Sequence, residues 1–453
     1  NMKKVLGIFT LCLFAFSYSF AEEKKTISKF NGAYTYSHFC TNEPEPKYDG
    51  SRFIIEDGVI SNDKGGGGRW DIKKYKLNKK GNLSIQAQRK DRKYKIKGKL
   101  DIEGQKIEGK LLAKRYSKNG EYEKDCDIVF TKVGDLPKKI SFDDDRKVTE
   151  IKVTSKNVYH EISLLKDEGK KQKIRVELRN LDNLSKGLII VLPSSTPNMD
   201  DEKFYEKQVS EFGFATAIVF GAEPRYQKKF TGSYTSSMIM YDAIATINAV
   251  SKKFSKPKEV ILIASSTGAL AIFKAGWQDY IDKYPSMKLI SKGFMINAAC
   301  PDRFEAKFNK DVQLIAVNGA WDDSTPGSIC KDLKDSGSFE NIHLLAYSGG
   351  HHFESPMYPP TKFISNSLTL LPNCSINYKK NLYQIIKKRD GTGEWDSETK
   401  GYEKDQREWL GNNCIKSGAT QGFEEYSSNM FWEDMRSYLV DKVEIQTLKG
   451  YLK

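Results

Sequence analysis

The stretch Glu259–Gly268, which reads EVILIASSTG, decides the fold of the larger part of this chain. Val260–Ala264 is continuously apolar, as expected of a strand that is buried on both faces of a sheet. The residues that follow Gly268, Ala269–Trp277, favour a helix. The stretch therefore predicts a buried strand, a sharp turn and a helix in direct succession.

Similar strands and helices alternate on both sides of this stretch. Alternation of buried strands with helices predicts a mostly parallel, doubly wound α/β sheet, which we assign to residues 136–453. Functional sites of such sheets lie beyond the carboxyl ends of the strands. The expected strands are 148–154, 173–179, 187–192, 214–220, 259–264, 293–297, 312–317 and 342–347, and the expected helices are 201–212 and 236–253.

Ser266 is the candidate nucleophile. It stands in a small-x-Ser-x-Gly pattern between Ala264 and Gly268, the form of a strained strand-to-helix turn that exposes a reactive serine. Small residues must flank such a serine because the turn is tight. The alternative is a serine that only caps the N-terminus of the following helix.

A serine nucleophile needs a base, and the chain has five histidines. His38 belongs to the N-terminal region, and we expect His160 and His343 to lie in strand-like runs. His351 and His352 alone stand in a glycine-rich loop after an expected strand. One of these two is the predicted base.

The acid that orients the base is expected between the serine and the histidine in the chain, after a strand. The strand that ends at Val317 runs into a loop whose first carboxylate is Asp322, and Asp323 is the adjacent alternative. A pair of aspartates that only form a turn is the other interpretation.

Two backbone N–H groups are candidates for stabilising a negatively charged oxygen in the transition state. One is that of Thr267, directly after the nucleophile. The other is that of Ser195, in the loop after the strand at 187–192.

Together these motifs resemble the dienelactone-hydrolase-like branch of the α/β-hydrolases over about residues 145–365. The resemblance implies a hydrolase with a Ser266, Asp322 and histidine triad. The motifs that carry it are Ser266–Gly268, Gly319–Pro326 followed by Cys330, Tyr347–Glu354, Glu223–Arg225 and Tyr241–Ala243.

The chain departs from this branch at three points. It has serine where dienelactone hydrolases proper use cysteine, and Pro193-Ser194 where a His-Gly pair is usual. Its histidine loop is one residue shorter. Alignment on Phe353 makes His351 the base, which we prefer, whereas alignment on Tyr347 makes it His352.

Two regions precede the α/β part. Residues 1–21 have a basic start, an apolar stretch and small residues near the end, and the sequence becomes polar directly after them. This pattern predicts a secretory signal. An uncleaved anchor is the alternative. Residues 22–135 alternate short strands with glycine turns and predict a small all-β accessory domain, either a sandwich or a barrel. We therefore expect a secreted or periplasmic protein.

Six cysteines remain after the expected signal is removed, and an even number in an exported chain suggests disulfides. Two of them bracket the N-terminal β-rich region, two lie within the α/β region and two bracket the C-terminal stretch, which favours pairing within each of these three regions. No CxxC and no histidine–cysteine cluster occurs, so we expect no metal. The expected pairs are Cys40–Cys126, Cys300–Cys330 and Cys374–Cys414.

The net charge of +14 comes from lysines scattered among acids. This distribution argues against a nucleic-acid reader. Residues 89–115 are the most basic part. Solvated strand faces explain them, and weak association with an anionic envelope surface is the alternative. The β-rich domain itself would then bind glycan or lipid.

The C-terminal region is expected to form a disulfide-closed excursion over about 366–425, followed by an amphipathic helix at 427–442 that packs on the sheet. This excursion either covers the active site or is inert surface. The sequence thus predicts an exported serine hydrolase that needs no cofactor and cleaves a carboxylic ester or related acyl bond. A decayed hydrolase-fold binding protein of the cell envelope is the alternative.

Overall fold

A computed structural model of the chain forms two compact units, residues 1–139 and 140–453. The expected signal, residues 1–21, lies outside the described residues. No helix among the residues described is long and apolar enough to span a membrane. The structure describes residues 30–40, 47–56, 59–62, 71–78, 80–89, 92–100, 106–117, 120–134, 146–194, 199–227, 234–337, 341–358, 360–369, 373–401 and 404–444.

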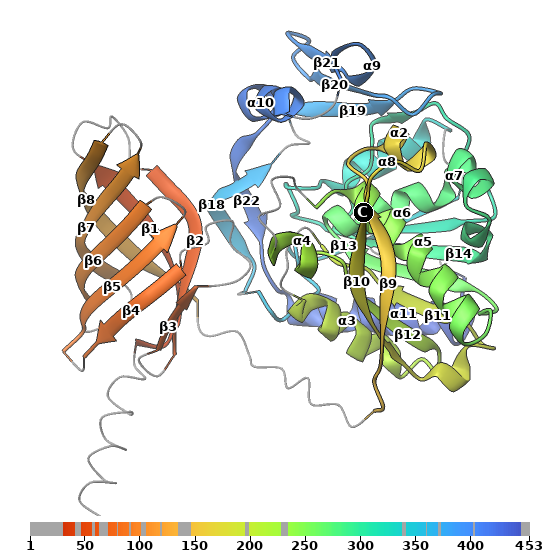
Figure 1. Cartoon of the computed structure of the whole chain (residues 1–453), viewed down its shortest axis with the longest axis horizontal. Coiled ribbons are helices and arrows are strands. Elements are labelled where there is room, and N and C mark those ends of the chain that lie inside the picture. Colours follow the sequence, from red (N-terminus) through yellow and green to blue (C-terminus); the bar gives the residue numbers. More distant parts are fainter. Residues whose placement is uncertain are drawn as a thin grey trace, which may run out of the picture. The chain divides into compact units, whose positions relative to one another are not determined.

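The first unit is one antiparallel sheet in the order β3-β2-β1-β8-β7-β6-β5-β4 (Figure 1). Its edge strands β3 and β4 lie beside one another, so the single sheet curls toward closure, which favours the barrel alternative. Leu83, Ile85 and Ile96 are among its buried side chains. The strands are β1 (Gly32–Cys40), β2 (Lys47–Glu56), β3 (Val59–Asn62), β4 (Asp71–Leu77), β5 (Asn82–Arg89), β6 (Arg92–Leu100), β7 (Lys106–Ser117) and β8 (Gly120–Gly134).

Cys40 stands directly opposite Cys126 in the register of β1 and β8. Side chains on directly opposed residues of antiparallel strands are close enough for a disulfide in suitable pairs. The side chains of these two cysteines lie outside the described part, so their pairing stays a prediction.

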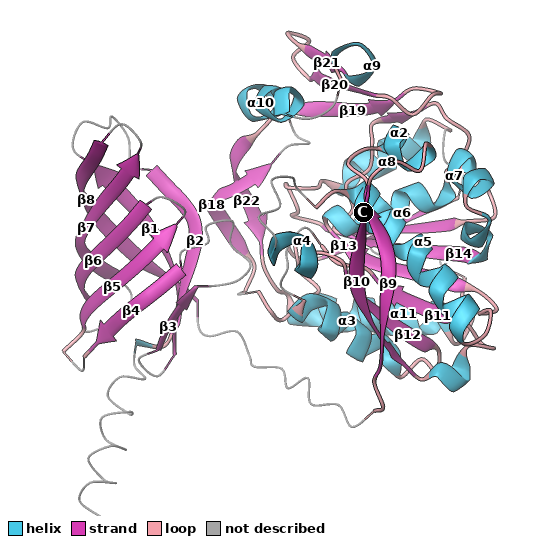
Figure 2. Cartoon of the chain, viewed as in Figure 1, coloured by secondary structure: helices cyan, strands magenta, loops and turns pink. Residues whose placement is uncertain are grey.

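The second unit is built on a mixed sheet in the order β17-β16-β14-β13-β11-β12-β10-β9 (Figure 2). When these eight strands are numbered 1 to 8 along the chain and read from β9 to β17, their order in the sheet is 1-2-4-3-5-6-7-8. β10 runs opposite to the other strands of the sheet, so it is antiparallel to both β9 and β12. This order defines the α/β-hydrolase fold, as expected. The strands are β9 (Thr149–Asn157), β10 (Lys170–Arg179), β11 (Leu188–Val191), β12 (Ala215–Phe220), β13 (Val260–Ser265), β14 (Ile290–Ile296), β16 (Gln313–Gly319) and β17 (Ile342–Tyr347).

Helices cover both faces of this sheet. Successive side chains of a strand point to opposite faces, and in β13 all of them are buried, so both faces need a covering layer. In β13, Leu262 joins the core under α5 (Ser236–Lys253) and α6 (Thr267–Phe273). Ile261 and Ile263 join the core under α3 (Asp200–Ser210) and α11 (Glu425–Leu439). The predicted packing of the last helix on the sheet is therefore confirmed.

Shorter helices fill the connections. His160 corrects one expectation, because it is not in a strand. It caps α2, where its side chain accepts a hydrogen bond from the backbone N–H of Ser163. His343 lies in β17, as expected. The remaining helices before the excursion are α2 (Glu161–Leu165), η2 (Leu181–Asn183), α4 (Glu223–Gln227), η3 (Lys274–Gly276), α7 (Gln278–Lys283), η4 (Pro285–Leu289) and α8 (Gly327–Asp335).

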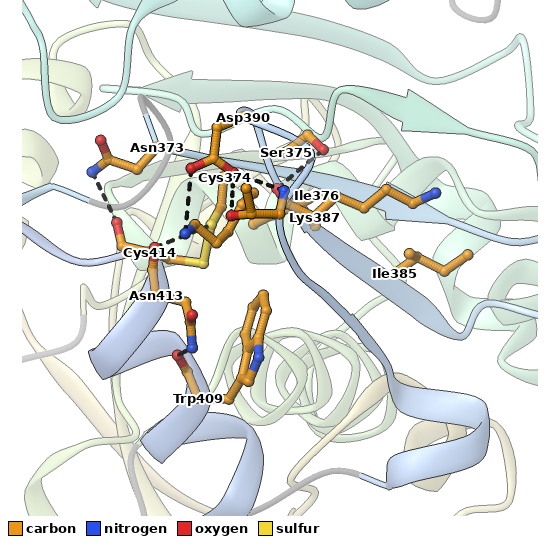
Figure 3. The surroundings of a disulfide bond; sticks show 12 residues. Asn373, Cys374, Ser375, Ile376, Ile385, Lys387, Asp390, Trp409, Asn413 and Cys414 are labelled. Carbon is orange, nitrogen blue, oxygen red and sulfur yellow. Dashed lines mark hydrogen bonds and ion pairs between the residues drawn. A yellow bond between two sulfur atoms is a disulfide. The ribbon is translucent and has the colours of Figure 1, made fainter.

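The C-terminal excursion contributes to two small sheets, β15-β19-β20-β21 and β18-β22, of which β15 comes from the segment after β14 and not from the excursion. The predicted disulfide Cys374–Cys414 is present, and Figure 3 shows its surroundings. It packs against Trp395 and Ile386 and joins the start of β19 to the end of α10. The elements are β15 (Arg303–Phe304), β18 (Lys362–Thr369), β19 (Cys374–Tyr378), β20 (Gln384–Lys388), β21 (Glu394–Asp396), α9 (Ser397–Lys400), α10 (Lys404–Asn413) and β22 (Lys416–Gln421).

The predicted disulfide Cys300–Cys330 is also present. It links the chain just after β14 to α8, the helix that follows the predicted acid loop. Two predicted pairings out of the three are thus confirmed in the described part of the chain.

Candidate active site

Ser266 lies between the end of β13 and the start of α6, in a sharp turn. Its backbone has φ 53° and ψ −119°, a conformation that costs a residue with a side chain about 1–3 kcal/mol. It stands at the N-cap position of α6 but makes no capping hydrogen bond with its side chain. The helix-cap interpretation of this serine is therefore not supported.

The turn is packed so tightly that only small residues fit around it. A Cβ added to Gly268 would lie 2.6 Å from Cβ of Ala264 and 2.7 Å from the carbonyl oxygen of Pro193. Ala264, the first residue of the small-x-Ser-x-Gly pattern, therefore lies directly against Gly268, the last one. Alanine at position 264 is accommodated because position 268 is glycine.

Asp322 and His351 form a buried pair. Nδ1 of the imidazole is 2.9 Å from Oδ2 of the carboxylate, and each residue is 5% exposed. Thr325 supports the carboxylate with its backbone N–H at 2.8 Å and its hydroxyl at 2.7 Å. The structure thus brings together two of the predicted site residues.

Each member of this pair changes the pKa of the other. Burial favours the neutral forms, but the negative charge of Asp322 and its hydrogen bond raise the pKa of His351 above 6.5. The positive charge of His351 and the hydrogen bonds from His351 and Thr325 outweigh burial and lower the pKa of Asp322. The arrangement stabilises a charged imidazole.

The neighbouring alternatives make other contacts. His352 stacks on Tyr358, with ring centroids 4.1 Å apart. Burial and the adjacent charge of His351 lower its pKa. The carboxylate of Asp323 accepts a hydrogen bond of 2.6 Å from the backbone N–H of Thr420. Among the described contacts, the histidine–aspartate pair is 351 with 322.

The turn at Ser266 and the histidine loop meet through residues to which the sequence analysis assigned no role. Asn297, at the end of β14, donates from Nδ2 to the hydroxyl of Ser265 at 3.0 Å and to Glu354 Oε2 at 2.9 Å. Tyr205 donates to the other oxygen of Glu354 at 2.5 Å. A polar side chain at the carboxyl end of a buried strand was the available signal for Asn297.

Glu354 is fully buried and charged. Burial raises its pKa, but hydrogen bonds from His352, Tyr205 and Asn297 lower it below its usual value overall. A buried carboxylate is tolerated only when such donors surround it. Glu354 therefore joins the histidine loop to α3 and to the turn at Ser266.

The loop after β11 is held by Glu202, which accepts from the backbone N–H of Ser194 at 2.8 Å. Burial and the charge of Asp201 raise the pKa of Glu202 to about 8. Its other oxygen has no hydrogen-bond partner among the residues described. Ser195, the predicted second oxyanion donor, lies outside the described residues.

The excursion contributes backbone contacts to the site. The N–H of His351 donates to the carbonyl of Thr420 at 2.9 Å, and the N–H of Gly422 donates to the carbonyl of His351 at 2.8 Å. The end of β22 thus holds the histidine loop from outside the main sheet. Within the described parts, no three His, Cys, Asp or Glu side chains are arranged to hold a metal ion.

Comparisons with known proteins place the fold in context. No family model matches the chain, and no curated protein matches it. Solved structures of α/β-hydrolases are similar to it at low sequence identity.

They include the esterase Pf2001 of Pyrococcus furiosus (14% identity, 46% of this chain and 85% of that one, TM-score 0.33). A protein from Klebsiella pneumoniae described as a dienelactone hydrolase is similar at 10% identity, over 46% and 89% of the two chains, with a TM-score of 0.32. XC6422 from Xanthomonas campestris, a serine hydrolase without a lid, is similar at 13% identity, over 45% and 86%, with a TM-score of 0.30.

Proposed function

We propose that this chain is an exported serine hydrolase of the α/β-hydrolase fold that cleaves a carboxylic ester or a related acyl bond. Ser266 attacks the acyl carbon, and His351 accepts its proton and later returns it to the leaving group. Asp322 holds the imidazole in one tautomer and stabilises its charged form. The product is an acid and an alcohol, formed with one water.

The observation that carries this proposal is the buried hydrogen bond between His351 and Asp322, which lie in loops beyond the carboxyl ends of the strands, as does the strained Ser266 directly after β13. A histidine that only filled space would not need a buried carboxylate, because removing two charged groups from water is costly. The backbone conformation of Ser266 adds a cost of about 1–3 kcal/mol that a serine without a role would not need. Both features fit a site built for proton transfer.

The proposed oxyanion donors are the backbone N–H groups of Thr267 and Ser195. Losing one such donor typically lowers turnover by about two to three orders of magnitude. Pro193-Ser194, where a His-Gly pair is usual, favours the alternative of a decayed hydrolase-fold protein that binds at the cell envelope. The two proposals differ in one property, which is the reactivity of Ser266.

Two measurements test the function. The first is hydrolysis of p-nitrophenyl esters with short and long acyl chains. The second is labelling by a fluorophosphonate, mapped to its peptide by mass spectrometry. We expect label on Ser266, and both signals lost in Ser266→Ala with unchanged thermal unfolding. Ser210→Ala is the matched control, because the one hydrogen bond of that hydroxyl among the described residues goes to the carbonyl of Lys207 near the end of α3. Hydrolysis by Ser266→Ala at the wild-type rate would refute the assignment, and a folded wild type that neither labels nor hydrolyses would favour the decayed alternative.

A further inference from the structure

One face of the N-terminal sheet is lined with lysines. In β4, β5 and β6 the side chains alternate between the two faces, and Leu83, Ile85 and Ile96 point to the buried one. The register pairs Ile85 with Ile96 and Leu83 with Gly98, so the intervening residues share the opposite face. That face is exposed.

Five lysines flank a neutral row on this face, which we call the lysine face. The middle row, on β5, consists of Asn82, Ser84 and Gln86. The residues of this row have their cross-strand partners on β6 on one side and on β4 on the other side. The lysines are Lys74 and Lys76 on β4 and Lys95, Lys97 and Lys99 on β6, all exposed.

The spacing makes these charges act together. Lysines two residues apart on one strand are separated by about 7 Å, and those on β4 and β6 by about 10 Å across β5. These distances are no larger than the Debye length of about 10 Å at 0.1 M salt. Within the bounds of the three strands one acidic residue, Asp71 at the start of β4, stands against nine lysines and arginines, so positive charge predominates.

We propose that the lysine face binds a linear anionic polysaccharide lying along β5. Lysines on β4 and β6 would pair with carboxylates or sulfates on either side of the chain. The amide and hydroxyl groups of Asn82, Ser84 and Gln86 would accept and donate hydrogen bonds to sugar hydroxyls. The site belongs to a different unit from Ser266 and does not depend on the proposed hydrolase activity.

The composition of the lysine face favours this partner over two others. Proteins that bind single-stranded nucleic acid combine basic residues with aromatic side chains that stack on bases. Proteins that lie on membranes insert apolar side chains beside the basic ones. The described side chains of this face include neither kind, and Tyr75 shares a register position with the buried Ile85, hence the other face.

Binding of the full-length protein to a polyuronate (alginate oligomers), measured at increasing NaCl, tests the proposal. We expect binding that weakens steeply with salt. Replacing all five lysines of the face by glutamine should weaken it by roughly tenfold or more at low salt. Replacing only the three on β6 should give a partial loss. Uncharged dextran of equal length should not bind.

The matched control removes the same charge from the second unit, by glutamine at Lys166, Lys170, Lys171, Lys252 and Lys256, which are all exposed. This control should bind the polyuronate as the wild type does. Surface substitutions of this kind usually change stability by about 0.5 kcal/mol or less, and arginine at the same five face positions should retain binding. Equal losses in the face variant and the control would overturn the proposal. So would stronger face-dependent binding to phosphatidylglycerol vesicles or to oligo-dT than to the polyuronate.

Discussion

The hydroxyl of Ser265 lies 3.5 Å from Nδ1 of His352. These residues directly precede and follow, respectively, the proposed nucleophile Ser266 and the proposed base His351. The turn and the histidine loop therefore touch through their neighbours, and Glu354 and Asn297 extend the contact. The geometry of the proposed triad depends on this buried polar network as much as on the triad itself.

Glu354→Gln tests the network. The new amide keeps an oxygen that can accept from Tyr205, but its NH2 group then faces the NH2 group of Asn297, so one buried donor loses its acceptor. We expect the free energy of unfolding to fall by about 1–3 kcal/mol and kcat to fall with little change in KM. Urea unfolding and ester hydrolysis measure the two effects.

Glu211→Gln provides the control for this substitution, because Glu211 is exposed just after α3. It should change stability by no more than about 0.5 kcal/mol. A fully stable and fully active Glu354→Gln would show that the network does not position the histidine loop.

Asp322→Asn should lower kcat by about 10⁴ with the fold preserved, because the amide favours the wrong tautomer of His351. Asp323→Asn is the matched control. Its carboxylate accepts from Thr420 rather than from a histidine, so activity should stay within a few-fold of the wild type, by the reasoning that only the first acid orients the base. The reverse pattern would move the acid role to Asp323.

The sequence predicted the elements of the site better than their connections. Ser266 was recognisable because a buried strand, a tight turn and a helix are all local patterns. The link between Tyr205 and Glu354 joins residues 149 positions apart, and no local pattern reports such a contact. His160 was assigned to a strand because the apolar residues around it suggest one, whereas its side chain satisfies the N–H of Ser163 as a helix cap.

The pH dependence of activity follows from the shifted pKa of His351. A general base must be neutral, and Asp322 raises the pKa of this imidazole above 6.5. We therefore expect kcat/KM to rise with pH along a limb whose midpoint lies above 6.5. In Asp322→Asn the burial of the ring is no longer opposed by that charge, so the midpoint of the residual activity should move to lower pH.

A pH–rate profile of both proteins on one ester measures this shift. A wild-type midpoint below 6.5, or identical midpoints in the two proteins, would contradict the proposed pairing of base and acid.

Glu202 makes the free energy of unfolding fall as pH rises, which is opposite to the effect of a carboxyl group whose pKa is lowered by folding. Its pKa is about 8 in the folded chain, against an ordinary value of 4.5, so between these values the folded state holds a proton that the unfolded state has released. Its stabilising contribution is therefore present below pH 4.5 and is lost as pH rises toward 8, by at most about 1.4 kcal/mol per pH unit.

Glu202→Gln should flatten this dependence while keeping an oxygen for the N–H of Ser194. Asp201, whose pKa is raised to about 7 by burial and the charge of Glu354, should leave a smaller slope. Urea unfolding from pH 5 to pH 8 measures the change, with Glu211→Gln as a control that keeps the wild-type slope. An unchanged slope in Glu202→Gln would mean that Glu202 is ionised in the folded protein.

Gly268→Ala should damage the turn at Ser266 even though it adds only a methyl group. The new Cβ would meet Cβ of Ala264 and the carbonyl oxygen of Pro193 at under 3 Å, and neither atom belongs to a flexible side chain that could swing away. Relief requires the turn or the loop after β11 to shift. We expect a loss of about 1–3 kcal/mol in stability, with slower fluorophosphonate labelling of Ser266. Gly411→Ala is the matched control, because nothing lies within 4 Å of its added Cβ in α10 and alanine favours a helix by up to about 1 kcal/mol. If Gly268→Ala labels at the wild-type rate and unfolds no earlier than Gly411→Ala, the tight packing of the turn is not what holds Ser266 in its strained conformation.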